Sequence, residues 1–205
     1  MMSHRLSRPV LLGIVGLLSA FGFTSCGVKE DTRNKMIVSV RDQKMLLVRD
    51  GKPIKSYKIS TSKFGIGDRP GSNYTPLGHM RIAKKIGGNA VPGTVFKSRR
   101  PTREIVQPNA PGRDPIVSRI MWLSGCEPHN SNTFRRYIYI HGTPEESRLG
   151  TPASYGCIRM GVKDVVDLYN RVGTGADVYV TRNSLQSLPA TQSYVRTTPV
   201  SRRGQ

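Results

Sequence analysis

The chain has 205 residues, of which 37% are hydrophobic, so it has room for one compact domain with less compact segments beside it. It carries 32 Lys and Arg against 13 Asp and Glu, a formal net charge of +19, and such a balance favours an anionic partner. No zinc finger, helix-turn-helix or RNP-like pattern accompanies the charge, which argues against nucleic acid and leaves an anionic wall polymer or membrane surface as partner.

Residues 1–26 have the pattern of an export signal. A basic start, with Arg5 and Arg8, precedes an apolar stretch from Val10 to Phe23 that is short for a transmembrane helix. The stretch ends before Cys26, in a context that resembles the cleavage box of bacterial lipoproteins. On this interpretation Cys26 becomes the lipidated first residue and anchors the protein to a membrane from outside. Plain signal-peptidase cleavage and an uncleaved anchor are the alternatives, and all three place the protein in the cell envelope or periplasm.

The body of the chain predicts a mostly β domain over residues 36–181, after a polar linker at 27–35. Period-2 patterns predict strands at 36–40, 44–48, 54–60, 79–83, 116–123, 137–140 and 176–181. Asp50-Gly51 marks a hairpin turn between the second and third of these. His79 is expected to be a strand residue, and Trp122 is expected in the core.

One helix is predicted after residue 161. Val162, Val165 and Tyr169 have helical spacing, while Asp164 and Arg171 suit the two ends of the helix dipole.

Residues 84–115, rich in Pro and Gly, are expected to form an irregular insertion, either a binding loop or lid or a solvated surface loop. Residues 182–205 predict a disordered basic tail.

The segment from Tyr137 to Met160 carries the candidate chemistry. It begins as a strand that ends at His141-Gly142, turns through a polar loop, and returns at Ser154-Tyr155-Gly156-Cys157. A loop between paired elements can bring its two ends together, which would give a Cys/His pair in which imidazole takes the thiol proton. Alone, the Cys would be read as a small buried hydrophobe and the His as structural. Gly156 and consecutive N–H groups beside the thiol favour an oxyanion site, and Arg159 is a candidate carboxylate ligand.

The three cysteines are Cys26, Cys126 and Cys157. If Cys26 is acylated, Cys126 and Cys157 remain, and two cysteines in an exported protein often form a disulfide. We expect both thiols to be free, because a disulfide would silence Cys157. No Cys or His cluster has metal-site spacing, so neither a metal nor a cofactor is expected.

At these residues the chain resembles the L,D-transpeptidase catalytic domain, the YkuD family. The family pattern is His-Gly, a loop of about this length, then Ser/Thr-His-Gly-Cys-hydrophobic-Arg. The sequence matches it at His141, Gly142, Ser154, Gly156, Cys157, Ile158 and Arg159. It departs at Tyr155, where the family usually has His, and at Gly161 and Val162, where a polar pair is common. The hairpin at 38–60 and the segment Thr75-Pro76-Leu77-Gly78 also resemble the family.

The resemblance implies a β-sandwich with a small mixed α/β rim, acting as a monomer on peptidoglycan stem peptides. Cys157 would be the nucleophile and His141 the general acid and base. The Gly142 carbonyl would orient His141, and the backbone N–H groups of Tyr155, Gly156 and Cys157 would hold the oxyanion. Ser154 and Arg159 would contact substrate.

Three functions stay open at this point. A transpeptidase would pass the acyl group from Cys157 to an amine of a second stem and form a 3→3 cross-link. A carboxypeptidase or other hydrolase on the same fold would pass it to water. An inactive relative would bind peptidoglycan with Tyr155 as a block.

Overall fold

The structure is a computed structural model that describes residues 29–188. The export signal and Cys26, and the chain from residue 189 onward, lie outside the described residues. Within residues 29–188, no helix is both long and apolar enough to cross a membrane.

Ten strands and one α-helix make up the described chain. The strands are β1 (Asn34–Ser39), β2 (Lys44–Arg49), β3 (Lys52–Ser60), β4 (Gly78–Ile86), β5 (Thr94–Lys97), β6 (Arg100–Ile105), β7 (Val117–Gly125), β8 (Tyr139–Gly142), β9 (Ile158–Met160) and β10 (Asp177–Thr181), and the helix is α1 (Val162–Arg171). Short 3₁₀ turns occur at Pro128–Asn130, Glu146–Arg148 and Leu185–Ser187. The mostly β class with one helix is therefore confirmed.

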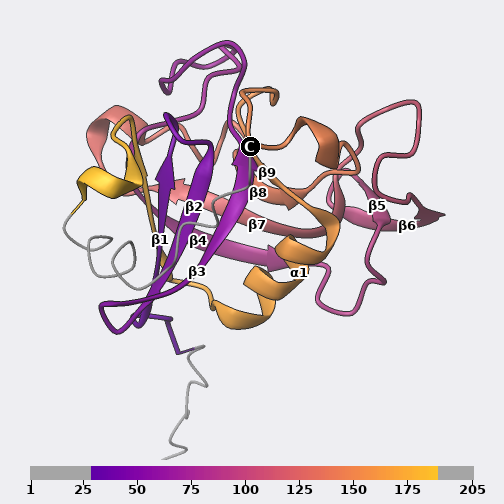
Figure 1. Ribbon diagram of the computed structural model, residues 1–205, viewed down its shortest axis with the longest axis horizontal. Helices are drawn as coiled ribbons and strands as arrows, with labels where there is room; N and C mark the ends of the chain where they lie inside the picture. Colours follow the sequence, from indigo (N-terminus) through magenta and orange to yellow (C-terminus); the bar gives the residue numbers. More distant parts are fainter. Residues whose placement is uncertain (1–28, 189–205) are drawn as a thin grey trace, which may run out of the picture.

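The strands form one continuous ladder in the order β4-β10-β1-β2-β3-β9-β8-β7-β5-β6, and an additional β4–β7 pairing closes it on itself. Figure 1 shows β1, β2 and β3 in front of β4 and β7, with the two sets of strands crossing. The core between them is lined by inward-facing residues such as Met36, Leu47, Met80 and Leu123. Val165 and Leu168 of α1 enter the same core, so the helix closes one end of it.

Two parallel pairs interrupt the otherwise antiparallel ladder. β1 pairs with β10, and β8 pairs with β9 so that His141 lies opposite Arg159. A parallel pair requires a crossover connection, and here residues 143–157 supply it. This crossover is the polar loop of the sequence pattern, and it returns Cys157 to the strand that carries His141.

The segment at 84–115 is more regular than predicted. β4 continues to Ile86, and β5 and β6 form a hairpin that pairs with β7 through Val95 and Val117. Figure 1 shows this hairpin projecting from the body beside β7. Phe96 is buried against Trp122 and Tyr139, which anchors the hairpin and explains why it is ordered.

Two predicted boundaries also differ. β8 begins at Tyr139 because Tyr137 has a positive φ of 58°, which breaks the extended backbone before the strand. At the other end, residues 182–188 are not a tail, since Leu185 is buried against Ile37, Leu46 and Val48 on the outer face of β1 and β2.

Candidate functional site

The outer face of β8 carries the candidate site. Ile138 and Ile140 point into the main core, so the alternation of the strand places Tyr139 and His141 on the opposite face. Cys157 packs on that face against a small cluster that includes Trp122 and Tyr139. A cavity of about 140 Å³ is lined by His141, Cys157, Ser154, Tyr155, Arg159, Asp114 and Ile116. The predicted Cys and His therefore line one cavity.

His141 is held in a defined orientation. Its side chain is buried, and Nδ1 lies 2.9 Å from the carbonyl oxygen of Gly142. When Nδ1 carries the proton, its N–H donates a hydrogen bond to that carbonyl. The lone pair of Nε2 is then free to accept a proton. Burial lowers the pKa of His141, against the opposing effects of the Gly142 carbonyl and Asp114. At neutral pH the imidazole is therefore uncharged and able to act as a base.

Cys157 rests as a neutral thiol. Its Sγ accepts a hydrogen bond from the Tyr139 N–H at 3.4 Å and donates to the Tyr137 carbonyl at 3.5 Å. Burial raises the pKa of the thiol to about 11, although the Tyr139 N–H and the charges of Arg136 and Arg159 favour the thiolate. The raised pKa of the thiol and the lowered pKa of the imidazole both favour the uncharged pair over a thiolate–imidazolium pair.

The turn before Cys157 is fixed by its own hydrogen bonds. The Ser154 hydroxyl donates to the Cys157 carbonyl at 2.6 Å and accepts from the Gly156 N–H at 3.2 Å. Thr75, from the Thr-Pro-Leu-Gly segment, donates its hydroxyl to the Gly156 carbonyl at 2.9 Å. Ser154 thus has a structural contact, and the Gly156 N–H, one of the predicted oxyanion donors, is already engaged.

Gly156 also needs to be glycine. Its φ is +119°, and a Cβ there would lie 3.2 Å from both Ile138 Cδ1 and the Tyr74 carbonyl oxygen. A side chain would be strained by its backbone conformation and would press on the strand and on the loop that follows β3.

Arg159 lies inside the site rather than open to solvent. Its side chain is 4% exposed and forms ion pairs with Asp114 and, at 3.2 Å, with Glu145. Its Nε and Nη2 atoms are buried without hydrogen-bond partners. Asp114 also accepts the Thr143 hydroxyl. Two carboxylates therefore already neutralise Arg159, and a role in substrate binding remains a prediction.

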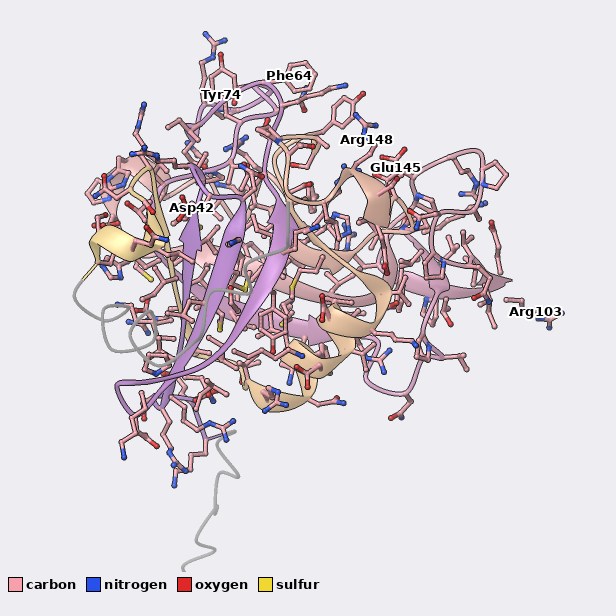
Figure 2. The ribbon with its side chains drawn as sticks, viewed as in Figure 1. Asp42, Phe64, Tyr74, Arg103, Glu145 and Arg148 are labelled. Atoms are coloured by element: carbon pink, nitrogen blue, oxygen red, sulfur yellow. The ribbon has the colours of Figure 1, made fainter. Side chains whose placement is uncertain are left out.

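Tyr155 forms part of the rim of the site. It is 65% exposed, its ring lies 5.3 Å from that of Phe64, and its hydroxyl accepts a hydrogen bond from Lys63 Nζ at 3.1 Å. Figure 2 shows Phe64 and Tyr74 together on the loop after β3, with Glu145 and Arg148 beside it. The phenol is thus tied to this loop through Lys63.

Sequence reasoning missed the buried ion pair behind the nucleophile. Arg136 and Asp68 are joined at 2.9 Å with side chains only 7% and 5% exposed. Arg136 also donates to the carbonyl oxygens of Gly67 and, at 2.7 Å, Tyr74. It therefore fastens the loop that supports Gly156, and its charge acts on Cys157. Neither Arg136, Asp114 nor Glu145 belongs to a local motif, so only the fold reveals them.

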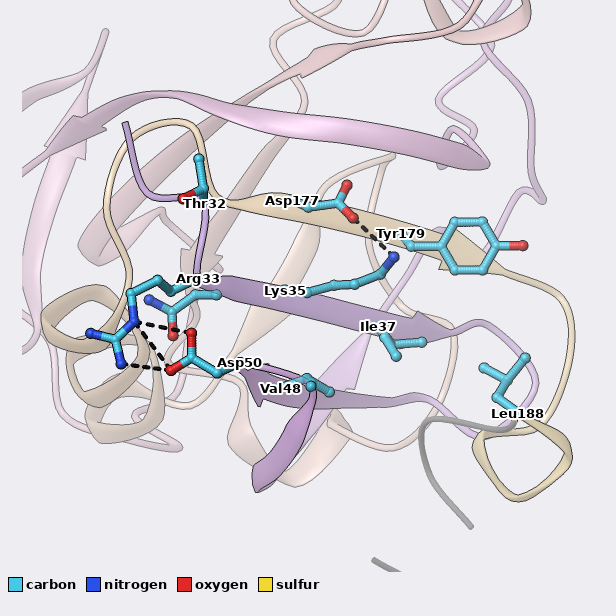
Figure 3. Close-up of a pocket in the computed structure, with 11 residues that line it drawn as sticks. Thr32, Arg33, Lys35, Ile37, Val48, Asp50, Asp177, Tyr179 and Leu188 are labelled. Atoms are coloured by element: carbon cyan, nitrogen blue, oxygen red, sulfur yellow. Dashed lines mark hydrogen bonds and ion pairs between the residues drawn. The ribbon is translucent and has the colours of Figure 1, made fainter. Parts of the chain in front are cut away.

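A larger cavity of about 460 Å³ lies elsewhere, over the outer face of β1, β2 and β10 (Figure 3). Its charged groups are paired, Arg33 with Asp50 and Lys35 with Asp177. Its lining contains no Cys or His. The chemistry predicted from the sequence therefore belongs to the smaller cavity.

The remaining candidates lie away from Cys157. His79 stacks on Tyr179 and contacts Asp177 at 3.3 Å, as a strand residue of β4. Cys126 is a free and exposed thiol, and Cys157 is also free. Within the described part of the chain, no group of three His, Cys, Asp or Glu side chains is arranged to hold a metal ion.

Comparisons with known proteins point to one family. The sequence signature described as the L,D-transpeptidase catalytic domain (YkuD) matches residues 33–180. No curated protein matches the sequence. Similar solved structures include an L,D-transpeptidase from Mycobacterium smegmatis (16% identity, 73% of this chain and 58% of that chain, TM-score 0.48). Another is from Mycobacterium tuberculosis H37Rv (16% identity, 73% and 57%, TM-score 0.47).

An L,D-transpeptidase from Xylanimonas cellulosilytica is similar as well (16% identity, 76% of this chain and 63% of that chain, TM-score 0.47). The chain thus spans less than two thirds of the length of each of these structures.

Proposed function

The chain belongs to the L,D-transpeptidase catalytic domain family, and we propose that it is a cysteine-dependent acyltransferase acting on peptidoglycan stem peptides. The observation that carries this proposal is that Cys157 and His141 line one cavity, with His141 Nδ1 held by Gly142. That arrangement leaves the lone pair of Nε2 as the proton acceptor in the cavity that both residues line.

In the first half-reaction His141 Nε2 takes the thiol proton as Cys157 Sγ attacks the carbonyl carbon of the third stem residue, a diamino acid. The oxyanion would be held by backbone N–H groups of the turn, and those of Tyr155 and Cys157 are the candidates because Gly156 donates to Ser154. When the tetrahedral intermediate collapses, the C–N bond breaks and His141 returns its proton to the amine of the departing D-Ala. The product is a thioester on Cys157.

The second half-reaction runs in reverse order. The side-chain amine of a second stem attacks the thioester carbonyl, His141 removes a proton from the attacking nitrogen, and the C–S bond breaks. The thiolate regains a proton and a 3→3 cross-link is released. Since the pKa shifts favour a neutral resting thiol, His141 must take the thiol proton in the course of each acylation.

Hydrolysis differs only in the acceptor, because water would replace the amine. The test is product analysis with a stem tetrapeptide, with and without a diamino acceptor. A transpeptidase yields the cross-linked product when the acceptor is present, whereas a hydrolase yields the tripeptide in both cases.

Two variants connect this test to the site. Cys157→Ser should abolish turnover with the fold retained, because a serine hydroxyl ionises far less than a thiol. His141→Ala should lower the rate by ~10²–10⁴, the usual range for a general acid or base. Turnover by Cys157→Ser within tenfold of the unchanged protein would contradict the assignment of the nucleophile.

A further inference from the structure

An aromatic platform lies next to the nucleophile on the outer face of β7 and β8. We define it by Trp122, Phe134, Tyr137 and Tyr139. Trp122 stacks on Phe134 with ring centres 4.2 Å apart and meets Tyr139 edge-on at 5.4 Å. Cys157 packs against the cluster that contains Trp122 and Tyr139, and its Sγ bonds to the backbone of Tyr137 and Tyr139.

Two cations lie over this platform: Lys84 Nζ is 5.8 Å from the ring centres of Trp122 and Phe134, and Arg99 is placed there by the tip of the β5–β6 hairpin. Its guanidinium carbon lies 5.2 Å from the centre of the Trp122 ring and 5.1 Å from that of Tyr137. Its pKa is raised, chiefly by a side-chain hydrogen bond with Tyr139. No ion pair joins Arg99 to a carboxylate anywhere in residues 29–188. A guanidinium that stacks on ring faces keeps N–H groups at its edge for another partner.

The backbone that presents Arg99 is unusual. Lys97 pairs with Arg100, so Ser98 and Arg99 form a two-residue turn, with φ values of 47° and 66°. Such turns prefer Asn-Gly or Asp-Gly because both central residues need positive φ. An Arg held in this conformation over the site favours a role for its side chain beyond closing the hairpin.

We propose that Arg99 is a specificity-determining residue that binds a carboxylate of the acyl donor beside Cys157. This inference rests on the proposed function and extends it to the recognition of the donor. The C-terminal carboxylate of D-Ala lies within about 3.6 Å of chain length from the reacting carbon, and the side-chain carboxylate of the diamino acid is attached to the same residue as that carbon. Tyr137 contacts both groups, with its ring under Arg99 and its carbonyl bonded to Cys157 Sγ, and this shared residue places Arg99 on the platform beside the reaction centre.

A stem tetrapeptide offers two sources of this carboxylate: the C-terminal D-Ala and the side chain of a diamino acid. Three donor peptides separate them, one with all carboxylates free, one with a C-terminal amide and one with the side-chain carboxylate amidated. Acylation of Cys157 is followed by intact mass, and kcat/KM for acylation is measured for each peptide.

Arg99→Gln should lower kcat/KM for the fully free peptide by about 10- to 100-fold, the usual effect of losing a hydrogen bond to a charged group. With the unchanged protein, amidation of the carboxylate that Arg99 binds should lower kcat/KM by a similar factor, which identifies that carboxylate. With this amidated peptide, Arg99→Gln and the unchanged protein should have the same kcat/KM. Arg103→Gln is the matched control. It removes the same charge from the same hairpin, and Arg103 lies at the far end of the hairpin (Figure 2), so its kinetics should be unchanged.

Two results would overturn the inference while leaving the proposed function intact. One is an equal kcat/KM of Arg99→Gln and the unchanged protein with the free peptide. The other is that Arg99→Gln lowers kcat/KM by the same factor with all three peptides. The second would show that Arg99 only supports the hairpin. If the unchanged protein is acylated by none of the peptides, the proposed function fails and this inference fails with it.

Discussion

At the scale of single residues, the site combines a thiol that is hard to ionise with an imidazole that is hard to protonate. Burial moves the pKa of Cys157 up to about 11 and the pKa of His141 down. Both shifts favour the uncharged pair. Attack on a substrate carbonyl therefore requires that the thiol proton pass to His141.

This description predicts the pH dependence of alkylation. Below its pKa a thiol gains thiolate about tenfold per pH unit, so the rate of Cys157 alkylation by iodoacetamide should rise about tenfold per unit from pH 7 to pH 10. Peptide mass spectrometry after timed labelling measures the rate, with the exposed Cys126 as internal reference. A rate that is constant between pH 6 and 8 would show a preformed thiolate–imidazolium pair.

Tyr155 tests whether the dyad is complete. Its hydroxyl is bonded to Lys63 and its ring contacts Phe64, so we assign it to the wall of the site. Tyr155→Phe should lower the acylation rate less than tenfold, about 1.4 kcal/mol. Tyr155→His, which restores the usual residue of the family, should remain active and serves as the companion variant. A 10³-fold loss in a folded Tyr155→Phe protein would mean that the phenol takes part in proton transfer.

At the scale of elements, the loop after β3 supports the nucleophile through a buried ion pair. Arg136→Met would leave Asp68 buried without its cation, a change that typically costs about 3–5 kcal/mol of unfolding free energy. It would also loosen the contacts with Tyr74 and Gly67. Denaturant unfolding measures the loss. Arg33→Met, which breaks the exposed pair with Asp50, is the control and should leave the unfolding midpoint nearly unchanged.

A stability of Arg136→Met close to that of the unchanged protein would contradict this assignment. It would mean that Asp68 is satisfied by its hydrogen bonds from Asn132 and Thr133 alone.

Several elements could be predicted from the sequence because their signals are local. The hairpin of β2 and β3 has a turn at Asp50-Gly51, where both φ values are positive, and α1 has its apolar spacing and end charges. The β5–β6 hairpin could not be predicted. β6 contains Pro101, its side chains are mostly exposed, and the order of the hairpin depends on Phe96 packing against Trp122, far along the chain.

The same distinction applies to the site. His141, Gly156 and Cys157 form a sequence pattern, and the parallel pairing of β8 with β9 brings them to one face. Asp114, Glu145 and Arg136 contribute charge to that face from separate loops. Asp114 and Glu145 pair with Arg159, and Arg136 pairs with Asp68. These ion pairs join segments that are far apart in the sequence, so residue spacing does not predict them.

At the scale of the whole molecule, the positive charge and the N-terminal sequence pattern both bear on the location of the protein in the cell. Most acidic residues of the described chain are paired with Lys or Arg, and the remaining Lys and Arg leave a large positive excess for an anionic surface. We propose an exported protein anchored by lipid at Cys26.

Mass spectrometry of the protein from its native host tests the anchor. We expect a diacylglyceryl or triacylated Cys26 as the first residue of the mature chain. A free mature N-terminus at another residue would refute lipidation and would be compatible with export by plain signal-peptidase cleavage.

The central claim is that Cys157 carries the acyl group. Intact-mass measurement after incubation with a stem tetrapeptide tests it directly, with Cys157→Ala as control. We predict an adduct equal to the peptide acyl group after loss of D-Ala, located on Cys157, absent from Cys157→Ala and released by a diamino acceptor or by water. An unmodified protein that nevertheless turns the peptide over, or an adduct located on Cys126, would contradict the account.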